Sequence, residues 1–105
     1  MSEQDPVNPI AFNDIDRLIH EPARLVIVAC LAVVEGADFL FLMRQTDLTK
    51  GNLSSHLSKL EEAGLVDIKK EFVNKIPRTF LSLSGKGRQA FEEYQNKMSA
   101  FLKGD

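Results

Sequence analysis

The sequence predicts a mainly α-helical domain with one small β-hairpin, in the order helix, helix, helix, helix, strand, strand, helix. Helices are indicated by apolar residues that recur three and four positions apart, as Leu53, Leu57 and Leu60 do. Strands are indicated by the alternation in residues 65–72, where Val66 and Ile68 share one face. A chain of 105 residues with 44% apolar and 27% charged residues has room for one globular domain.

The first half of the chain reads as short helices separated by helix-capping signals. Residues 1–8 are expected to form a mobile tail, and Asn8 with Pro9 to begin a short amphipathic helix. Residues 22–35 are apolar almost all round, so they predict a central helix that its neighbours cover and that Gly36 ends. Asp38 is expected to cap a third helix over residues 39–46.

A tight turn then leads to a fourth helix and a hairpin. Thr49 is expected to cap a helix over residues 50–63, and Gly64 to end it in the left-handed conformation. Strands are expected over residues 65–72 and 78–83, with a loop at residues 73–77 and a last helix over residues 85–102. A helix, a tight turn and a helix followed by a two-stranded wing form the winged helix-turn-helix arrangement, expected to span residues 9–103.

The charges of the chain are unevenly distributed. The net charge is −2, yet residues 1–43 carry two Lys and Arg against seven Asp and Glu, whereas residues 44–88 carry nine against five. The basic section coincides with the fourth helix and the hairpin, which favours nucleic-acid binding by that unit. An ordinary mixed surface is the alternative.

The fourth helix and the hairpin hold the candidate DNA-binding residues. On a helical wheel, small, polar and basic side chains lie opposite the leucine stripe, and the amino-terminal half of such a helix usually enters the major groove. The candidates are Thr49, Lys50, Asn52, Ser54, Ser55, Ser58 and Lys59 on the helix, and Lys75, Arg78 and Thr79 on the wing. Asn can read adenine, Ser can contact bases or phosphates, and basic wing residues contact phosphates or the minor groove. A solvated helix face and a lysine-protected sheet edge are the alternatives.

The first and last helices are candidates for a dimer interface, because one winged helix alone makes few phosphate contacts. The interface candidates are Ile15, Leu18, Phe91, Tyr94, Met98 and Phe101. These apolar side chains could instead cover the core of the monomer. Cys30, the only cysteine, is expected in the core, and His56 either contacts a phosphate or packs against the protein.

Several other classes of function find little support in the sequence. One cysteine and two distant histidines give no metal site, and no cofactor is expected. Neither a glycine-rich phosphate loop nor a nucleophile–base pair is visible, so the chain is not expected to be an enzyme. The longest apolar run, residues 25–34, is too short to span a membrane and no secretion signal is visible, so a cytoplasmic location is expected.

The run LTKGNLSSHLSKLEEAGLV at residues 48–66 resembles the recognition unit of small winged-helix transcriptional regulators related to the MarR and ArsR families. Lys70, Phe72, Pro77, Thr79 and the segment at residues 87–91 continue the resemblance. It implies a DNA-binding regulator, in most cases a homodimeric repressor, whose partner is a pseudo-palindromic double-stranded operator. A small-molecule effector could occupy the crevice beside the first helix, although no residue demands one. The alternative function is a winged helix that binds a protein partner without specific DNA binding.

Overall fold

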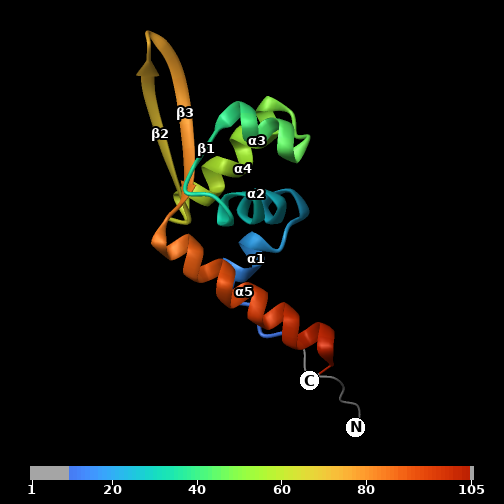
Figure 1. Cartoon of the computed structure of the whole chain (residues 1–105). Coiled ribbons are helices and arrows are strands. Elements are labelled where there is room, and N and C mark those ends of the chain that lie inside the picture. Colours follow the sequence, from blue (N-terminus) through green and yellow to red (C-terminus); the bar gives the residue numbers. More distant parts are fainter. Residues whose placement is uncertain (1–9, 105) are drawn as a thin grey trace.

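The computed structural model describes residues 10–104 and confirms the predicted fold class (Figure 1). Five helices and three strands follow one another within these residues. They are α1 (Asp14–Ile19), α2 (Pro22–Ala32), β1 (Ala37–Asp38), α3 (Phe39–Thr46), α4 (Lys50–Glu62), β2 (Val66–Val73), β3 (Ile76–Leu83) and α5 (Gly85–Lys103). The predicted tail and the predicted helix start at Asn8 and Pro9 lie outside the described residues.

Helix α1 begins at Asp14, later than expected, because Asn13 and Asp16 form a capping box. The Asn13 side chain accepts a hydrogen bond from the Asp16 amide at 2.8 Å, and the Asp16 carboxylate accepts one from the Asn13 amide at 3.1 Å. The two bonds satisfy amide groups that a helix start leaves without partners. The described residues before Asn13 are therefore not helical, and the prediction of a longer first helix was wrong there.

Helix α2 ends at Ala32, three residues before the predicted end, because of a contact from the far end of the chain. The Arg88 guanidinium on α5 donates to the carbonyl oxygens of Ala32 at 3.2 Å and Val34 at 2.9 Å. These bonds take up carbonyl groups that the last turn of a helix leaves free. Cys30, expected in the core, is half-buried at its edge.

The sheet has three antiparallel strands in the order β1-β3-β2. Strand β1 is only two residues long and was not predicted. Strand β3 begins at Ile76, two residues before the predicted start, because Asn74 and Lys75 form a two-residue turn with φ of 54° and 65°. Positive φ at both central residues is typical of a tight hairpin turn, so the expected five-residue loop is mostly strand.

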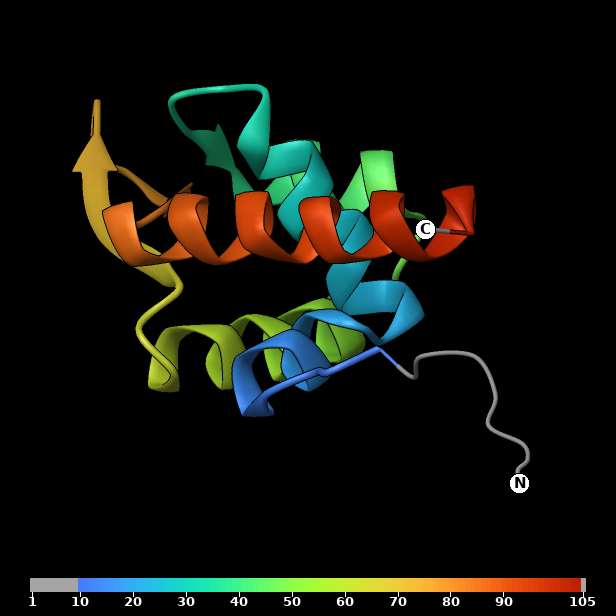
Figure 2. The same cartoon turned by 90° about the horizontal axis from the view of Figure 1, so that it is seen from below.

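The core lies where the helices meet the base of the hairpin. Its fully buried side chains come from every helix up to α4 and from both long strands: Ile19, Ile27, Val28, Leu31, Leu42, Leu53, Leu57, Leu60, Leu65, Val66 and Leu81. Beyond this core, the outer end of the hairpin projects away from the helices (Figure 1). Seen from below, α5 crosses in front of the other helices as one long helix (Figure 2).

Candidate nucleic-acid interface

Helix α4 is held so that one face is buried and the other is free. Leu53, Leu57 and Leu60 are at most 2% exposed, so the predicted leucine stripe is the buried face. The Thr49 side chain caps the helix by accepting from the Asn52 amide at 3.1 Å, and Asp47 ends α3 in the left-handed conformation. All seven helix candidates are exposed: Thr49, Lys50, Asn52, Ser54, Ser55, Ser58 and Lys59.

The hairpin β2–β3 presents two different faces, which its register defines. The face formed by Val66, Ile68, Lys70, Phe72, Pro77, Thr79, Leu81 and Leu83 is called the groove face here. Lys70 and Thr79, which are cross-strand partners on it, line an open groove of about 280 Å³ together with Lys50, Ser54 and Ser58 of α4. The structure therefore places three predicted residues of α4 beside the predicted wing residue Thr79. It also adds Lys70 to the candidate DNA-binding residues.

Lys69 and Lys70 are neighbours on β2, and the structure places their side chains on different faces of the hairpin. Lys70 lies on the groove face beside α4, whereas Lys69 lies on the opposite face and pairs with Glu71 at 3.3 Å. Neighbouring residues of a strand point to opposite sides, so only the strand register could decide which lysine shares a surface with α4.

The two predicted basic wing residues occupy different surroundings. Lys75 is exposed at the turn of the hairpin. Arg78 lies on the face opposite the groove, and its guanidinium reaches the Asp38 carboxylate at 3.4 Å. Asp38 also caps α3 by accepting from the Phe41 amide at 2.8 Å. Arg78 therefore links the hairpin to α3, and its charge is partly balanced within the protein.

The surface formed by α4 and the groove face and tip of the hairpin, called the reading region here, is positively charged. Among residues 10–104, Lys50, Lys59, Lys70 and Lys75 form no ion pair. No acidic residue occurs between Leu48 and Leu60, and the first ones are Glu61 and Glu62 at the end of α4. Unpaired lysines around an open groove suit a polyanionic partner.

His56 faces the protein rather than the open side of α4. Its Nδ1 lies 3.3 Å from a guanidinium nitrogen of Arg24 and 3.9 Å from the Glu21 carboxylate, at the start of α2. The Arg24 amide donates to the Glu21 carboxylate at 2.8 Å, and this hydrogen bond is the main reason that the pKa of Glu21 lies below its ordinary value. Arg24 also donates to the Leu18 carbonyl at 2.6 Å, so the cluster joins α1, α2 and α4.

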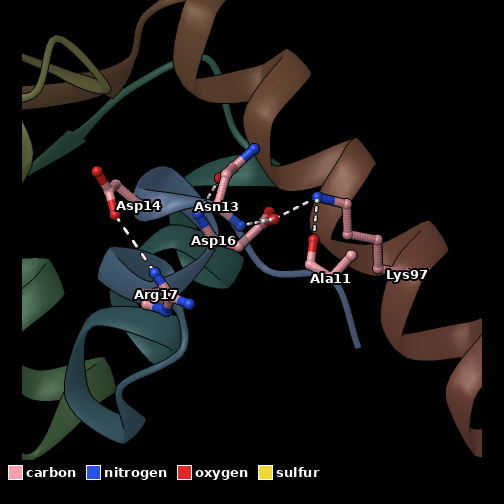
Figure 3. A network of polar contacts seen from close by, with 6 residues as sticks. All are labelled: Ala11, Asn13, Asp14, Asp16, Arg17 and Lys97. Carbon is pink, nitrogen blue, oxygen red and sulfur yellow. Dashed lines mark hydrogen bonds and ion pairs between the residues drawn. The ribbon is translucent and has the colours of Figure 1, made fainter. Parts of the chain in front are cut away.

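On the other side of the molecule, α1 and α5 form a layer whose polar side chains are joined to each other (Figure 3). Asp16 is 2% exposed, and its carboxylate pairs with the Lys97 ammonium, which also donates to the Ala11 carbonyl at 3.4 Å. The Tyr94 hydroxyl lies 2.6 Å from Nδ1 of His20. Burial is the main cause that raises the pKa of Tyr94, and the charge of Asp16 adds to it.

The six dimer candidates do not share one environment. Tyr94 and Phe91 are at most 9% exposed and belong to the core of the monomer, so little of either remains for a partner. Ile15, Leu18 and Met98 are partly buried against that core. Phe101 is 49% exposed, and Leu102, which the sequence places beside it, is 74% exposed. For Phe91 and Tyr94 the structure matches the alternative prediction, namely that they cover the core of the monomer.

Two absences concern only the part of the chain that the structure describes. No group of three or more His, Cys, Asp or Glu side chains in residues 10–104 is arranged to hold a metal ion. No helix within the same residues is long and apolar enough to cross a membrane.

A helix-turn-helix whose second helix exposes a polar face beside an adjoining hairpin defines the class of winged helix-turn-helix proteins. The family model of the winged helix DNA-binding domain matches residues 23–102, so the chain belongs to this family. Membership of this family makes the chain a DNA-binding regulator. The family and the fold are those of regulators and not of enzymes, in agreement with the prediction from the sequence. A MarR-family transcriptional regulator from Silicibacter pomeroyi, 22% identical, is among the solved structures to which this fold is similar, and this likeness confirms the predicted fold.

Three similar proteins illustrate the match. An uncharacterized protein of Methanocaldococcus jannaschii is 37% identical over 78 residues, which cover 74% of this chain and 85% of that protein. A transcriptional regulator homologue from Pyrococcus horikoshii has a TM-score of 0.80 at 31% identity, covering 84% of this chain and 87% of that one. NadR, solved in complex with 4-hydroxyphenylacetate, has a TM-score of 0.67 at 23% identity and covers 98% and 82%.

Proposed function

We propose that this protein is a sequence-specific transcriptional repressor that binds a pseudo-palindromic operator as a homodimer. The observation that carries the proposal is the reading region, where exposed polar residues of α4 and unpaired lysines meet around one groove. In this arrangement α4 enters the major groove and the wing contacts the backbone or the minor groove. Such a dimer represses most simply by occupying its operator.

The amino-terminal half of α4 is proposed to make the contacts with base edges. Asn52 is exposed one turn after the Thr49 cap, where its amide can form a donor–acceptor pair with adenine. Ser54 and Ser55 can contact bases or phosphates, and Lys50 and Lys59 are suited to phosphates. Glu61 and Glu62 mark the end of the contact, because a carboxylate close to the backbone is repelled.

Dimerisation is proposed to use the carboxy-terminal end of α5. Phe101 and Leu102 are exposed there, and Leu25, Met98 and Leu102 line a shallow cleft between α2 and α5. This end is remote from the wing (Figure 1). Two copies that pair there present their α4 helices on the same side, and a separation of about 34 Å matches one turn of duplex.

The test is a selection of bound sequences from random duplexes, followed by anisotropy titration of the preferred duplex. We expect a palindrome with half-sites one turn apart, and an affinity that falls about a thousandfold or more between about 50 and 200 mM salt. Sedimentation at the same concentrations reports the dimer. Binding that shows no preference over random duplex contradicts the proposal.

The alternative function is a winged helix that binds a protein partner, and the net charge of −2 is compatible with it. Charge reversal separates the two functions. Lys75→Glu with Lys70→Glu is expected to lower DNA affinity at least a hundredfold, because each removes an attraction and adds a repulsion. Lys69→Glu, on the opposite face of the same hairpin, is the matched control and is expected to retain most of the affinity. Equal DNA affinity in all variants would favour the protein-binding alternative.

A further inference from the structure

The outer part of the wing carries large apolar side chains that nothing in the described chain covers. Phe72 on β2 is 76% exposed and Ile76 on β3 is 56% exposed, and Pro77 is exposed as well. Along the groove face, exposure rises from the base of the hairpin to its tip, since Val66 and Leu81 are buried, Ile68 is half-buried and Phe72 is bare. The outer end of the hairpin projects away from the helices (Figure 1), and no other part of residues 10–104 covers Phe72.

Phe72 and Pro77 form a cross-strand pair with a favourable geometry. Val73 and Ile76 close the two-residue turn and are a hydrogen-bonded pair, so the next pair, Phe72 and Pro77, is of the non-hydrogen-bonded type. Side chains in such pairs lie closer together, and a proline there removes no bond from the β2–β3 ladder. The two rings therefore make one stiff apolar edge.

This edge lies between positive charges on the surface that is proposed to face DNA. Lys75 is beyond it at the turn, and Lys70 with Thr79 precedes it on the same groove face, next to α4. An apolar edge flanked by lysines suits a groove whose walls carry phosphates and whose floor is apolar sugar and base. Two such edges from separate copies would bring lysines against lysines, which disfavours a wing-to-wing contact.

We propose that Phe72, with its cross-strand partner Pro77 beside it, inserts between two base pairs in the minor groove next to the half-site. Affinity then depends on how easily this base-pair step unstacks. The inference rests on the proposed function and specifies what the wing recognises. Neither ring carries a hydrogen-bond donor or acceptor, so the contact cannot identify bases by their edges. It distinguishes sequences by deformation, because TA and CA steps open more easily than G·C-rich steps.

The experiment uses the full chain and the duplex that selection yields, with the flanking step either TA or GG. Phe72→Ala is expected to bind the TA duplex about tenfold more weakly and to lose most of the preference for TA over GG. Its salt dependence is expected to equal that of the wild type, because no charge is removed. The fluorescence of a 2-aminopurine placed at the flanking step is expected to increase when the wild type binds, and to stay unchanged when Phe72→Ala binds.

Two matched variants complete the design. Ile76→Ala removes an exposed apolar side chain from the opposite face of the same hairpin, and it is expected to leave affinity and flank preference unchanged. Lys75→Ala is expected to reduce the salt slope by about one while retaining the preference for TA. Both substitutions lie at exposed positions and leave the core intact, as Phe72→Ala does.

Three results overturn the inference. One is that Phe72→Ala keeps the affinity and the flank preference of the wild type while the wild type still prefers the selected duplex. That result leaves the proposed function standing. Another is an equal loss of affinity by Phe72→Ala and Ile76→Ala, which reflects a general weakening of the hairpin. The third is a change of self-association caused by Phe72→Ala. A wild type that prefers no duplex instead contradicts the proposed function itself.

Discussion

The reading region and the α1–α5 layer handle polar side chains in opposite ways. In the α1–α5 layer, Asp16 pairs with Lys97, and His20 with Tyr94, so each of these four side chains has a partner inside the protein. In the reading region, Lys50, Lys70 and Asn52 face outward beside an open groove. Groups satisfied internally hold a fold together, whereas groups left free on a rigid frame are available to bind. The two regions should therefore respond to substitution in different assays.

The largest effect is expected where the two regions join. Gly87, in the first turn of α5, lies so close to the residue before β2 that an added Cβ would be 2.0 Å from the Leu65 carbonyl oxygen. Gly87→Ala is therefore expected to lower the free energy of unfolding by about 3 kcal/mol, because the helix has to move away from backbone atoms. Gly85→Ala, two residues earlier with nothing within 4 Å, is the control and is expected to be neutral or slightly stabilising. Urea unfolding followed by circular dichroism measures both, and equal effects would contradict the close contact.

The next effect tests the internal pairing of the α1–α5 layer. Lys97→Met leaves the Asp16 carboxylate buried without its cation and is expected to cost about 2 kcal/mol, since Lys97 is itself one-third exposed. The double variant Asp16→Asn with Lys97→Met should recover part of that loss, because no unpaired charge remains. DNA affinity of the folded protein is expected to stay unchanged in both. A loss of affinity without a loss of stability would erase the distinction between the two regions.

A smaller effect, on DNA affinity rather than on stability, is expected from a substitution in α4. Asn52→Ala removes an exposed amide while Thr49 still caps the helix, so stability is expected to change by less than about 0.5 kcal/mol. Affinity for the preferred duplex is expected to fall about tenfold, with relaxed preference at one base position. Competition titrations with single-base variants of the duplex measure it. A loss that is uniform over all duplexes would make Asn52 a phosphate contact.

The smallest effect is a pH dependence of stability. Burial, aided by the charge of Asp16, raises the pKa of Tyr94 above its ordinary value, so the folded state keeps the phenol proton more firmly than the unfolded chain does. This contribution is fully present below the ordinary tyrosine pKa of about 10 and is lost as the pH rises through the raised value. Tyr94→Phe is expected to flatten the fall of the thermal midpoint on the alkaline side of about pH 10. An identical alkaline profile in the variant would show that other groups cause the fall.

The elements that local sequence determines were predicted well. Asp38, Thr49 and Gly64 all act as the caps or stops that their residue types indicate, and the leucine stripe of α4 is buried. These features depend on a few neighbouring residues, so the chain itself contains the information. The missed Asn13–Asp16 capping box was also local, and Asn followed three residues later by an acid was the signal for it.

The features that were missed depend on residues far apart in the sequence. The early end of α2 requires Arg88, strand β1 exists only because β3 lies beside it, and Arg78 meets Asp38 across 40 residues. The candidate site was predicted as two separate sets, on α4 and on the wing, and only the strand register selects Lys70 as the lysine beside α4. His56 had no readable role, because Glu21 and Arg24 reach it from another helix.

The position of Asp16 has a consequence for the order in which the chain acquires its structure. Helix α1 has six residues, too few to persist alone in water, and its capping carboxylate pairs with Lys97, 81 residues further along. The cation that completes this helix belongs to α5 and is synthesised long after α1 itself. Helix α1 is therefore expected to become ordered late, after α5 has docked, although it precedes α5 in the sequence.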